Sequence, residues 1–147
     1  MERDRLARTI SISQETFIDS ILARFNLVDV STVSTSLPPA TQLSAADCPA
    51  EQDEKEEIDT RPYREPVGAL AWLALGTRPD IVSASSSLAR FGHNPGCVHC
   101  EADKRVLRYL RGTKTWRLKL GGKTPEIATL MDADWGSPRD DRRSIGA

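Results

Sequence analysis

Apolar residues recur every three to four positions in four stretches of the chain, a spacing that predicts amphipathic helices. The first expected helix covers residues 14–26, the second residues 63–75, and the fourth residues 98–111. The third begins after Thr77, a residue type that caps helix N-termini. Its expected buried stripe consists of Ile81, Val82, Ser85, Leu88 and Phe91.

Alternation of apolar and polar residues predicts short strands near both ends of the chain. Residues 9–13 alternate and precede Ser13, which is expected to cap the first helix. Residues 115–120 form a second strand, which ends at a glycine pair. Residues 127–135 form a third, and another begins at residue 143. Helices followed by strands indicate an α+β fold.

The stretch between the first and second helices has a different character. Residues 31–42 are dominated by Ser, Thr and Pro, and Pro38-Pro39 excludes a helix there. Residues 51–57 are mostly acidic and offer little to bury. We therefore expect residues 31–60 to form a loosely packed, solvated linker that separates the N-terminal helix from a bundle of three helices.

Charge is divided unevenly along the 147 residues, although the net charge is only −1. Residues 1–59 hold 5 Lys/Arg against 12 Asp/Glu, and residues 60–147 hold 15 against 9. A basic half beside an acidic linker is typical of a part that faces nucleic acid. Three cysteines, no secretory signal and no apolar run long enough for a membrane span predict an intracellular protein without a membrane partner.

The strongest candidate binding surface is a basic set at the fourth helix and just beyond it. Lys104, Arg108 and Arg111 are spaced so that they share the helix face opposite the core. Such a face would contact the phosphates of a duplex without reading its sequence. The simpler alternative is an ordinary solvated face, balanced in part by Glu101 and Asp103. The whole set is Lys104, Arg105, Arg108, Arg111, Lys114, Arg117, Lys119 and Lys123.

Two further groups of residues carry candidate chemistry. Asp132 and Asp134 alternate on an expected strand, so both carboxylates share one face and suit Mg²⁺, although a solvated acidic strand end is the simpler interpretation. Arg78 would either touch nucleic acid or pair with a carboxylate, while Asp80 favours a helix N-terminus. Four potential zinc ligands, at irregular spacing that favours no known finger, are His93, Cys97, His99 and Cys100.

Five segments, in this order and spacing, resemble the copia-type (Ty1/copia, pseudoviral) LTR retrotransposon Pol polyprotein. They are Ile12–Gln14 with Phe17–Phe25, Pro62–Leu70, Thr77–Phe91, Pro95–Thr113, and Asp132–Ser144. Two departures stand out. Cys100 follows His99 where the family usually has Trp, and the chain ends Ser-Ile-Gly-Ala where the family reads Ser-Thr-Ser-Gly-Tyr.

The resemblance implies where in the polyprotein the chain lies. Residues 1–30 would be the end of the reverse transcriptase palm region with its following helix, and residues 31–60 the linker. Residues 61–114 would be the helical thumb and connection bundle. Residues 115–147 would be the first strands of an incomplete ribonuclease H-like sheet. Asp132 would match the first ribonuclease H aspartate and would bind Mg²⁺ in the parent enzyme.

The resulting expectation is a fragment of a reverse transcriptase and ribonuclease H polyprotein, without the polymerase aspartates and without independent catalysis. Its partners in the parent would be an RNA/DNA duplex and the rest of the Pol polyprotein. The alternative is a domesticated nucleic-acid-binding module that uses the basic segment 104–123. An isolated nuclease that depends on Asp132 is a weaker third hypothesis.

Overall fold

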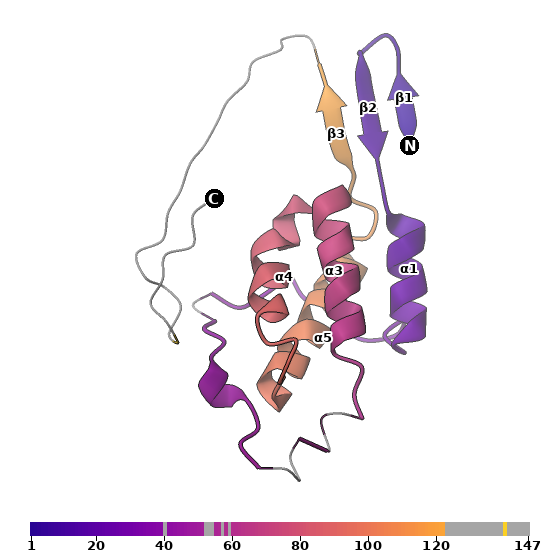
Figure 1. Ribbon diagram of the computed structural model, residues 1–147. Helices are drawn as coiled ribbons and strands as arrows, with labels where there is room; N and C mark the ends of the chain where they lie inside the picture. Colours follow the sequence, from indigo (N-terminus) through magenta and orange to yellow (C-terminus); the bar gives the residue numbers. More distant parts are fainter. Residues whose placement is uncertain (40, 52–54, 57, 59, 123–139, 141–147) are drawn as a thin grey trace.

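The computed structural model describes residues 1–39, 41–51, 55–56, 58, 60–122 and 140, and it combines helices with one antiparallel sheet (Figure 1). This arrangement confirms the expected α+β class. The expected strands at residues 127–135 and from residue 143 lie outside the described residues, as does Asp132. The ribonuclease H-like character of the sheet therefore stays a prediction.

The sheet has three strands: β1 (Glu2–Asp4), β2 (Thr9–Ile12) and β3 (Leu118–Gly121). Strand β2 lies in the middle and pairs antiparallel with both neighbours, so that Ile10 faces Arg3 on one side and Leu120 on the other. The strand expected at residues 115–120 thus forms, shifted towards its end, and it joins the N-terminal hairpin. The sequence pattern indicated neither β1 nor this pairing.

Helix α1 (Glu15–Arg24) follows β2 directly and confirms the first expected helix. Ile18, Ile21 and Leu22 form its buried face. The Ser13 hydroxyl accepts a hydrogen bond from the Glu15 backbone N–H at 3.1 Å. Gln14 is the residue that immediately precedes the helix, so Ser13 acts one position earlier than a standard N-cap.

Helix α3 (Arg64–Gly76) lies within one residue of its expected range. The chain then passes through the short 3₁₀ turn η2 (Pro79–Ile81) into α4 (Val82–Ala89). The expected cap at Thr77 is wrong, because its hydroxyl donates instead to Gln14 Oε1 at 2.7 Å. Val82 was expected in the core but is 45% exposed. The turn η2 breaks the helical periodicity there and rotates Val82 outwards.

Helix α5 (Cys97–Gly112) begins after Gly96, which has no room for a side chain. A Cβ there would lie 1.8 Å from the Asp47 carbonyl oxygen. Asp47 ends the 3₁₀ turn η1 (Ala45–Asp47), which belongs to the segment between α1 and α3. Gly96 therefore allows this segment to pack against the start of α5.

The core is one cluster of buried apolar side chains that includes residues of α1, α3, α4 and α5. Leu43 and Ile58, from the segment expected to be a solvated linker, are buried in the same cluster, and Val33 and Leu37 pack against it. The expectation that the first helix is separate from the bundle is wrong, although most of the described residues between α1 and α3 are exposed as expected. A few well-spaced apolar residues suffice to anchor a polar segment on a hydrophobic surface.

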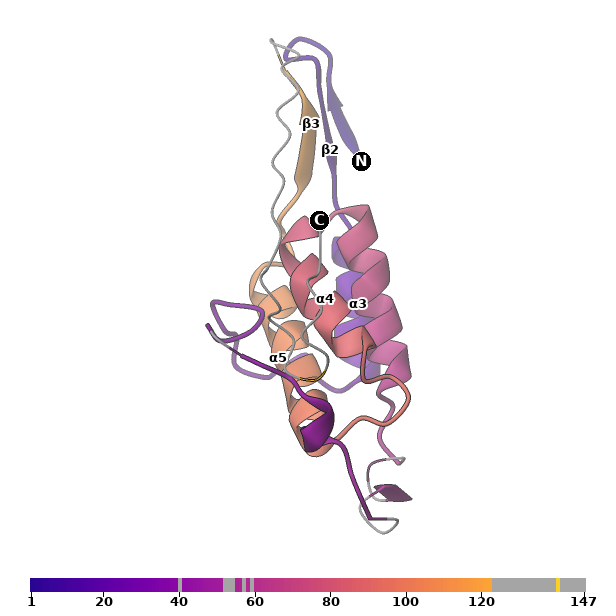
Figure 2. The same ribbon diagram turned by 60° about the vertical axis from the view of Figure 1, so that its left-hand side comes forward.

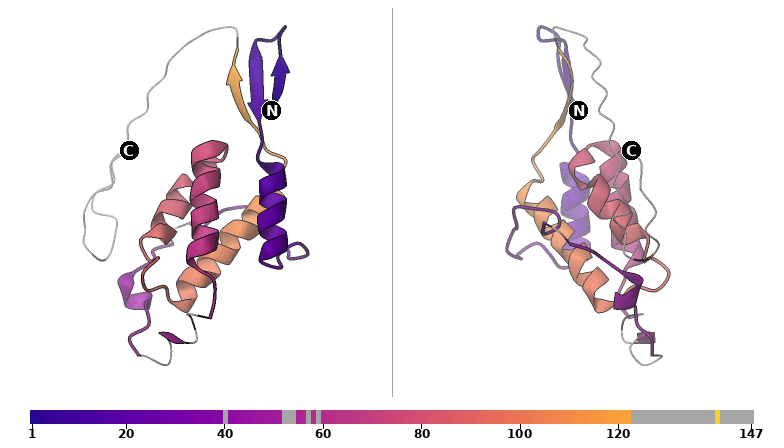
Figure 3. Two further views of the ribbon diagram at one scale, coloured as in Figure 1. Left: turned by 45° about the vertical axis from the view of Figure 1, so that its right-hand side comes forward. Right: turned by 90° about the vertical axis from the view of Figure 1, so that its left-hand side faces the viewer.

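The sheet stands at one end of the helices and projects beyond them, as two turned views make clear (Figures 2 and 3). Thr9 is the one buried residue among the three strands. In the same views α1 lies beside α5, and the two helices pack against each other. No helix in the described part of the chain is both long enough and apolar enough to cross a membrane.

Candidate nucleic-acid interface

Helix α5 has the two faces that its sequence predicts. Val106, Leu107 and Leu110 are at most 2% exposed and lie in the core. Arg105, Arg108 and Arg111 lie on the other side and are half-buried, whereas Lys104 is exposed. The structure therefore brings the predicted basic residues of α5 together on one surface, but it does not leave all of them open to solvent.

Residues 30–37, which we call the crossing segment, run across this basic face. Arg105 Nη2 donates to the Thr35 hydroxyl at 3.1 Å, and Arg108 donates to both the carbonyl and the hydroxyl of Ser31, each at 2.7 Å. Arg111 donates to the carbonyl oxygen of Val30. The basic face thus fastens the segment between α1 and α3 to the bundle.

These hydrogen bonds leave the positive charge of the face in place. The acceptors that the crossing segment offers to the three arginines are carbonyl and hydroxyl oxygens, which are neutral. An arginine that donates to a neutral acceptor keeps its full charge and its attraction for a phosphate. The face remains an electrostatic site even though part of its donor capacity is used.

Lys114, at the end of this surface, has a carboxylate partner. Its Nζ lies 2.8 Å from Asp19 Oδ1 of α1, and both side chains are partly exposed. A cavity of about 590 Å³ opens beside Lys114 and Arg111, but Asp19 and Asp29 also line it. This end of the basic surface is therefore the least suited to a phosphate. Of the remaining predicted residues, Arg117 pairs with Glu2, and Lys123 lies outside the described residues.

Asp103 does not balance the basic face as expected, because it points the other way and is only 4% exposed. Burial raises the pKa of Asp103 to about 7, and the charge of Lys104 opposes that shift. The sequence carries a signal that predicts this position. Asp103 lies three residues before Val106 and four before Leu107, which is the spacing of the core face.

Arg78 is buried, with 1% of its surface exposed, and its guanidinium lies 5.5 and 5.6 Å from the ring centres of Tyr109 and Trp116. It forms two hydrogen bonds to Asp80, at 2.9 and 2.7 Å, and donates to the hydroxyl of Thr113 at 2.6 Å. The Tyr109 hydroxyl also donates to Asp80, at 2.9 Å. The expected pairing of Arg78 with a nearby carboxylate is confirmed.

The charge state of Asp80 follows from this network. Burial opposes ionisation, but hydrogen bonds from Arg78 and Tyr109, together with the Arg78 charge, outweigh it and hold the pKa of Asp80 below its ordinary value. Asp80 is therefore an anion at neutral pH, locked to Arg78. The network is a structural link between η2 and the end of α5.

The possible zinc ligands do not assemble. His99 is fully buried, its Nδ1 accepts the Gly96 backbone N–H at 2.9 Å, and its ring lies 4.1 Å from that of Phe91. Burial is the main cause that lowers the pKa of His99. Cys97 is exposed while Cys100 is buried. Among the described residues, no group of three or more His, Cys, Asp or Glu side chains is arranged to hold a metal ion.

Comparison with known proteins gives a consistent picture over nearly the whole chain. It is 41% identical over 142 residues to the retrovirus-related Pol polyprotein from transposon TNT 1-94 of Nicotiana tabacum. It is 37% and 34% identical to the Pol polyproteins from transposons RE1 and RE2 of Arabidopsis thaliana. These matches cover 96–97% of this chain and 9–11% of each relative, so the chain spans about a tenth of their length.

No family model and no solved structure matches the chain. The same kind of name recurs beyond plants. A putative transposon Ty5-1 protein of Saccharomyces cerevisiae is 38% identical over 89 residues, which cover 60% of this chain and 29% of that protein. These relatives support the resemblance to copia-type retrotransposon polyproteins. The chain is thus a homologue of one segment of the retrovirus-related Pol polyproteins of transposons.

Proposed function

We propose that the chain is the segment of a retrotransposon reverse transcriptase that lies between the polymerase palm and the main part of ribonuclease H. Its role in the parent protein is to help hold the RNA/DNA duplex during RNA-directed DNA synthesis. Support comes from the order of the five matching segments and from the homologous Pol polyproteins. We expect no catalysis by this chain alone.

The observation that carries the duplex-holding role is the basic face of α5. One side of the helix holds four cationic side chains, those of Lys104, Arg105, Arg108 and Arg111. The oxygen atoms of the crossing segment that accept hydrogen bonds from the arginines are uncharged. Cations held in a row on a rigid helix attract the phosphate backbone without reading bases. That is the chemistry a polymerase needs to hold a template of any sequence.

Magnesium chemistry belongs to the parent protein in this proposal. Asp132 lies outside the described residues, and its role rests on the resemblance alone. In the complete polyprotein Asp132 would supply one carboxylate to Mg²⁺, a hard cation that prefers oxygen ligands. Hydrolysis of an RNA strand would need further ligands from the rest of that domain.

A binding experiment tests the proposal. A labelled RNA/DNA hybrid is titrated with the full chain at about 0.05 M and about 0.2 M salt, a range over which phosphate contacts lose much of their affinity. The double variant Lys104→Gln/Arg105→Gln should bind more weakly, and its log–log salt slope should be shallower by about one to two. The control variant Arg24→Gln removes a cation on α1 that lies 2.5 Å from the carboxylate of Glu65 and is not part of the basic face. This variant should bind the hybrid as the wild-type chain does.

Two outcomes would contradict a binding role. Equal affinities for the double variant and the wild-type chain would remove the basic face from the interaction. No affinity at the lower salt concentration would remove the alternative of an independent, domesticated binding module. That alternative is kept because one continuous core, from α1 to α5, forms within the described residues.

A further inference from the structure

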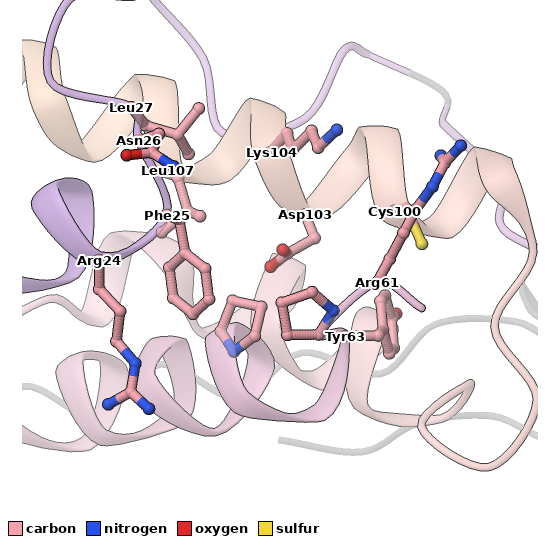
Figure 4. A pocket seen from close by; sticks show the side chains of 12 residues that line it. Arg24, Phe25, Asn26, Leu27, Arg61, Tyr63, Cys100, Asp103, Lys104 and Leu107 are labelled. Atoms are coloured by element: carbon pink, nitrogen blue, oxygen red, sulfur yellow. The ribbon is translucent and has the colours of Figure 1, made fainter. Parts of the chain in front are cut away.

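A cavity of about 280 Å³ lies between the end of α1, the start of α3 and the middle of α5 (Figure 4). Most of its wall is apolar. Phe25, Leu27 and Leu107 have no polar atoms in their side chains, and Pro62 and Pro66 have no backbone N–H to donate. The polar part of the lining consists of the side chains of Arg24, Asn26, Arg61, Tyr63, Asp103 and Lys104.

Asp103 places a carboxylate in this surrounding. Figure 4 shows its side chain pointing from α5 into the space between Phe25 and Tyr63. The residue is 4% exposed, and Oδ1 is buried without a hydrogen-bond partner in the described part of the chain. An acceptor buried without a partner is costly, and in folded proteins such groups are almost always satisfied by a donor, a water molecule or a ligand.

Cationic side chains also line the cavity, but they do not turn to the carboxylate. In Figure 4 the charged ends of Arg24, Arg61 and Lys104 point away from Asp103. The guanidinium of Arg24 instead pairs with the carboxylate of Glu65, at 2.5 Å. Tyr63 and Cys100 are the other titratable groups of the wall, and burial raises the pKa of each, so both stay neutral. Among the described residues that line the cavity, Asp103 is thus the sole anionic group.

We propose that this cavity binds a primary alkylammonium group, with the ammonium against Asp103 and the alkyl stem along Phe25, Pro66 and Leu107. An ammonium is a compact charge with three N–H donors that can be met by a single carboxylate oxygen and by water, whereas a guanidinium presents a planar fork that favours two parallel acceptors. Apolar walls suit the stem, since the transfer of methylene groups from water to an apolar surrounding is favourable. The space equals about nine water molecules at the volume each takes in the liquid, which admits an amine of a few carbons.

Carboxyl-carbon NMR of the full chain tests the proposal directly. The titration of Asp103 is followed with n-butylammonium, and again with 1-butanol at the same concentration as the uncharged control. Bound ammonium stabilises the carboxylate, so at ten times its Kd it should lower the apparent pKa of Asp103 by about one unit. No change with the amine, or an equal change with butanol, would overturn the proposal.

A pair of variants gives an independent readout from thermal unfolding at about pH 8, above the pKa at which Asp103 ionises. Butylammonium should raise the Tm of the wild-type chain and of Glu101→Gln, which removes an exposed carboxylate of the same helix. It should leave the Tm of Asp103→Asn unchanged. An equal rise in Asp103→Asn would show that the carboxylate does not bind the amine, and this would also overturn the proposal.

Discussion

The surroundings of Asp103 do not provide what its carboxyl group requires. Its carboxyl lies among apolar side chains and prolines, and neither a hydrogen bond nor an ion pair reaches Oδ1 within the described residues. Arg78 is equally buried, but it has a carboxylate, a hydroxyl and a carbonyl as partners. The cost of burying a charge is therefore offset at Arg78 by its partners, whereas at Asp103 it is not offset.

Stability should depend on pH through Asp103. Its folded-state pKa of about 7 exceeds the ordinary value of about 4 in the unfolded chain. Between these two pH values the folded protein holds a proton that the unfolded chain has released, so the free energy of unfolding falls as pH rises from about 4 to about 7. Because asparagine does not titrate, the free energy of unfolding of Asp103→Asn should not fall in this way as pH rises. The variant should match the wild-type chain near pH 4 and exceed its stability at pH 8 by a few kcal/mol, at most about 4.

Urea unfolding at several pH values measures this difference. Comparison with Glu101→Gln, which changes an exposed carboxylate on the same helix, separates burial from general charge effects. If the stability difference between Asp103→Asn and the wild-type chain were the same at pH 4 and at pH 8, Asp103 would not titrate with a raised pKa. The carboxyl would then be better solvated than its burial indicates.

At the scale of elements, polar contacts decide how the helices are joined. Arg78 and Asp80, at η2, reach Thr113 and Tyr109 at the end of α5. The crossing segment is held in a similar way by Arg105, Arg108 and Arg111 of the same helix. Helix α5 is thus the element that fixes both the turn between α3 and α4 and the segment between α1 and α3.

Replacing Arg78 with methionine should loosen the first of these joints. The change keeps an unbranched side chain but leaves Asp80 and Thr113 without the guanidinium, and breaking such a pair costs about 3 kcal/mol. The free energy of unfolding should fall by that amount. The control Arg90→Met removes a half-exposed arginine whose carboxylate partner, Asp140, lies 3.9 Å away, and should cost less than about 1 kcal/mol. Equal losses in both variants would show that the Arg78 network adds little to stability.

At the scale of the whole molecule, the N-terminal hairpin and the strand that follows the last helix meet in the sheet. Strand β2 pairs with β3, about a hundred residues away, while the helices between them carry the apolar core. No residue of the three strands belongs to that core. Sheet and bundle should therefore differ in stability, because backbone pairing with little buried apolar surface opens more readily.

Proline at position 10 should open the sheet alone. Ile10 lies in the central strand opposite Arg3 and Leu120, where proline removes a backbone donor and distorts the pairing. Hydrogen exchange should show protection of the β3 amides falling at least about tenfold, a loss of about 1.4 kcal/mol, while α5 amides keep theirs. Ile10→Val is the matched control, and it should change the protection of neither the β3 amides nor the α5 amides. Loss of α5 protection in Ile10→Pro would mean that the sheet and the helices unfold together.

The sequence by itself determined the four helices, two of the three strands and the basic face of α5. Each of these depends on local spacing, which repeats within a few residues and needs no knowledge of distant contacts. The resemblance to transposon Pol polyproteins was also visible in the order of short motifs, and the homologues support it. Arg78 beside Asp80 could be anticipated as a pair for the same local reason.

Only the tertiary structure decided what those surfaces contact. The pairing of β3 with β2, the crossing segment on the arginines of α5 and the cavity around Asp103 all join residues far apart in sequence. Leu43 and Ile58 entered the core although their polar neighbours predicted a linker. Burial depends on which surfaces meet in space, and a periodicity of three or four residues contains no information about that meeting.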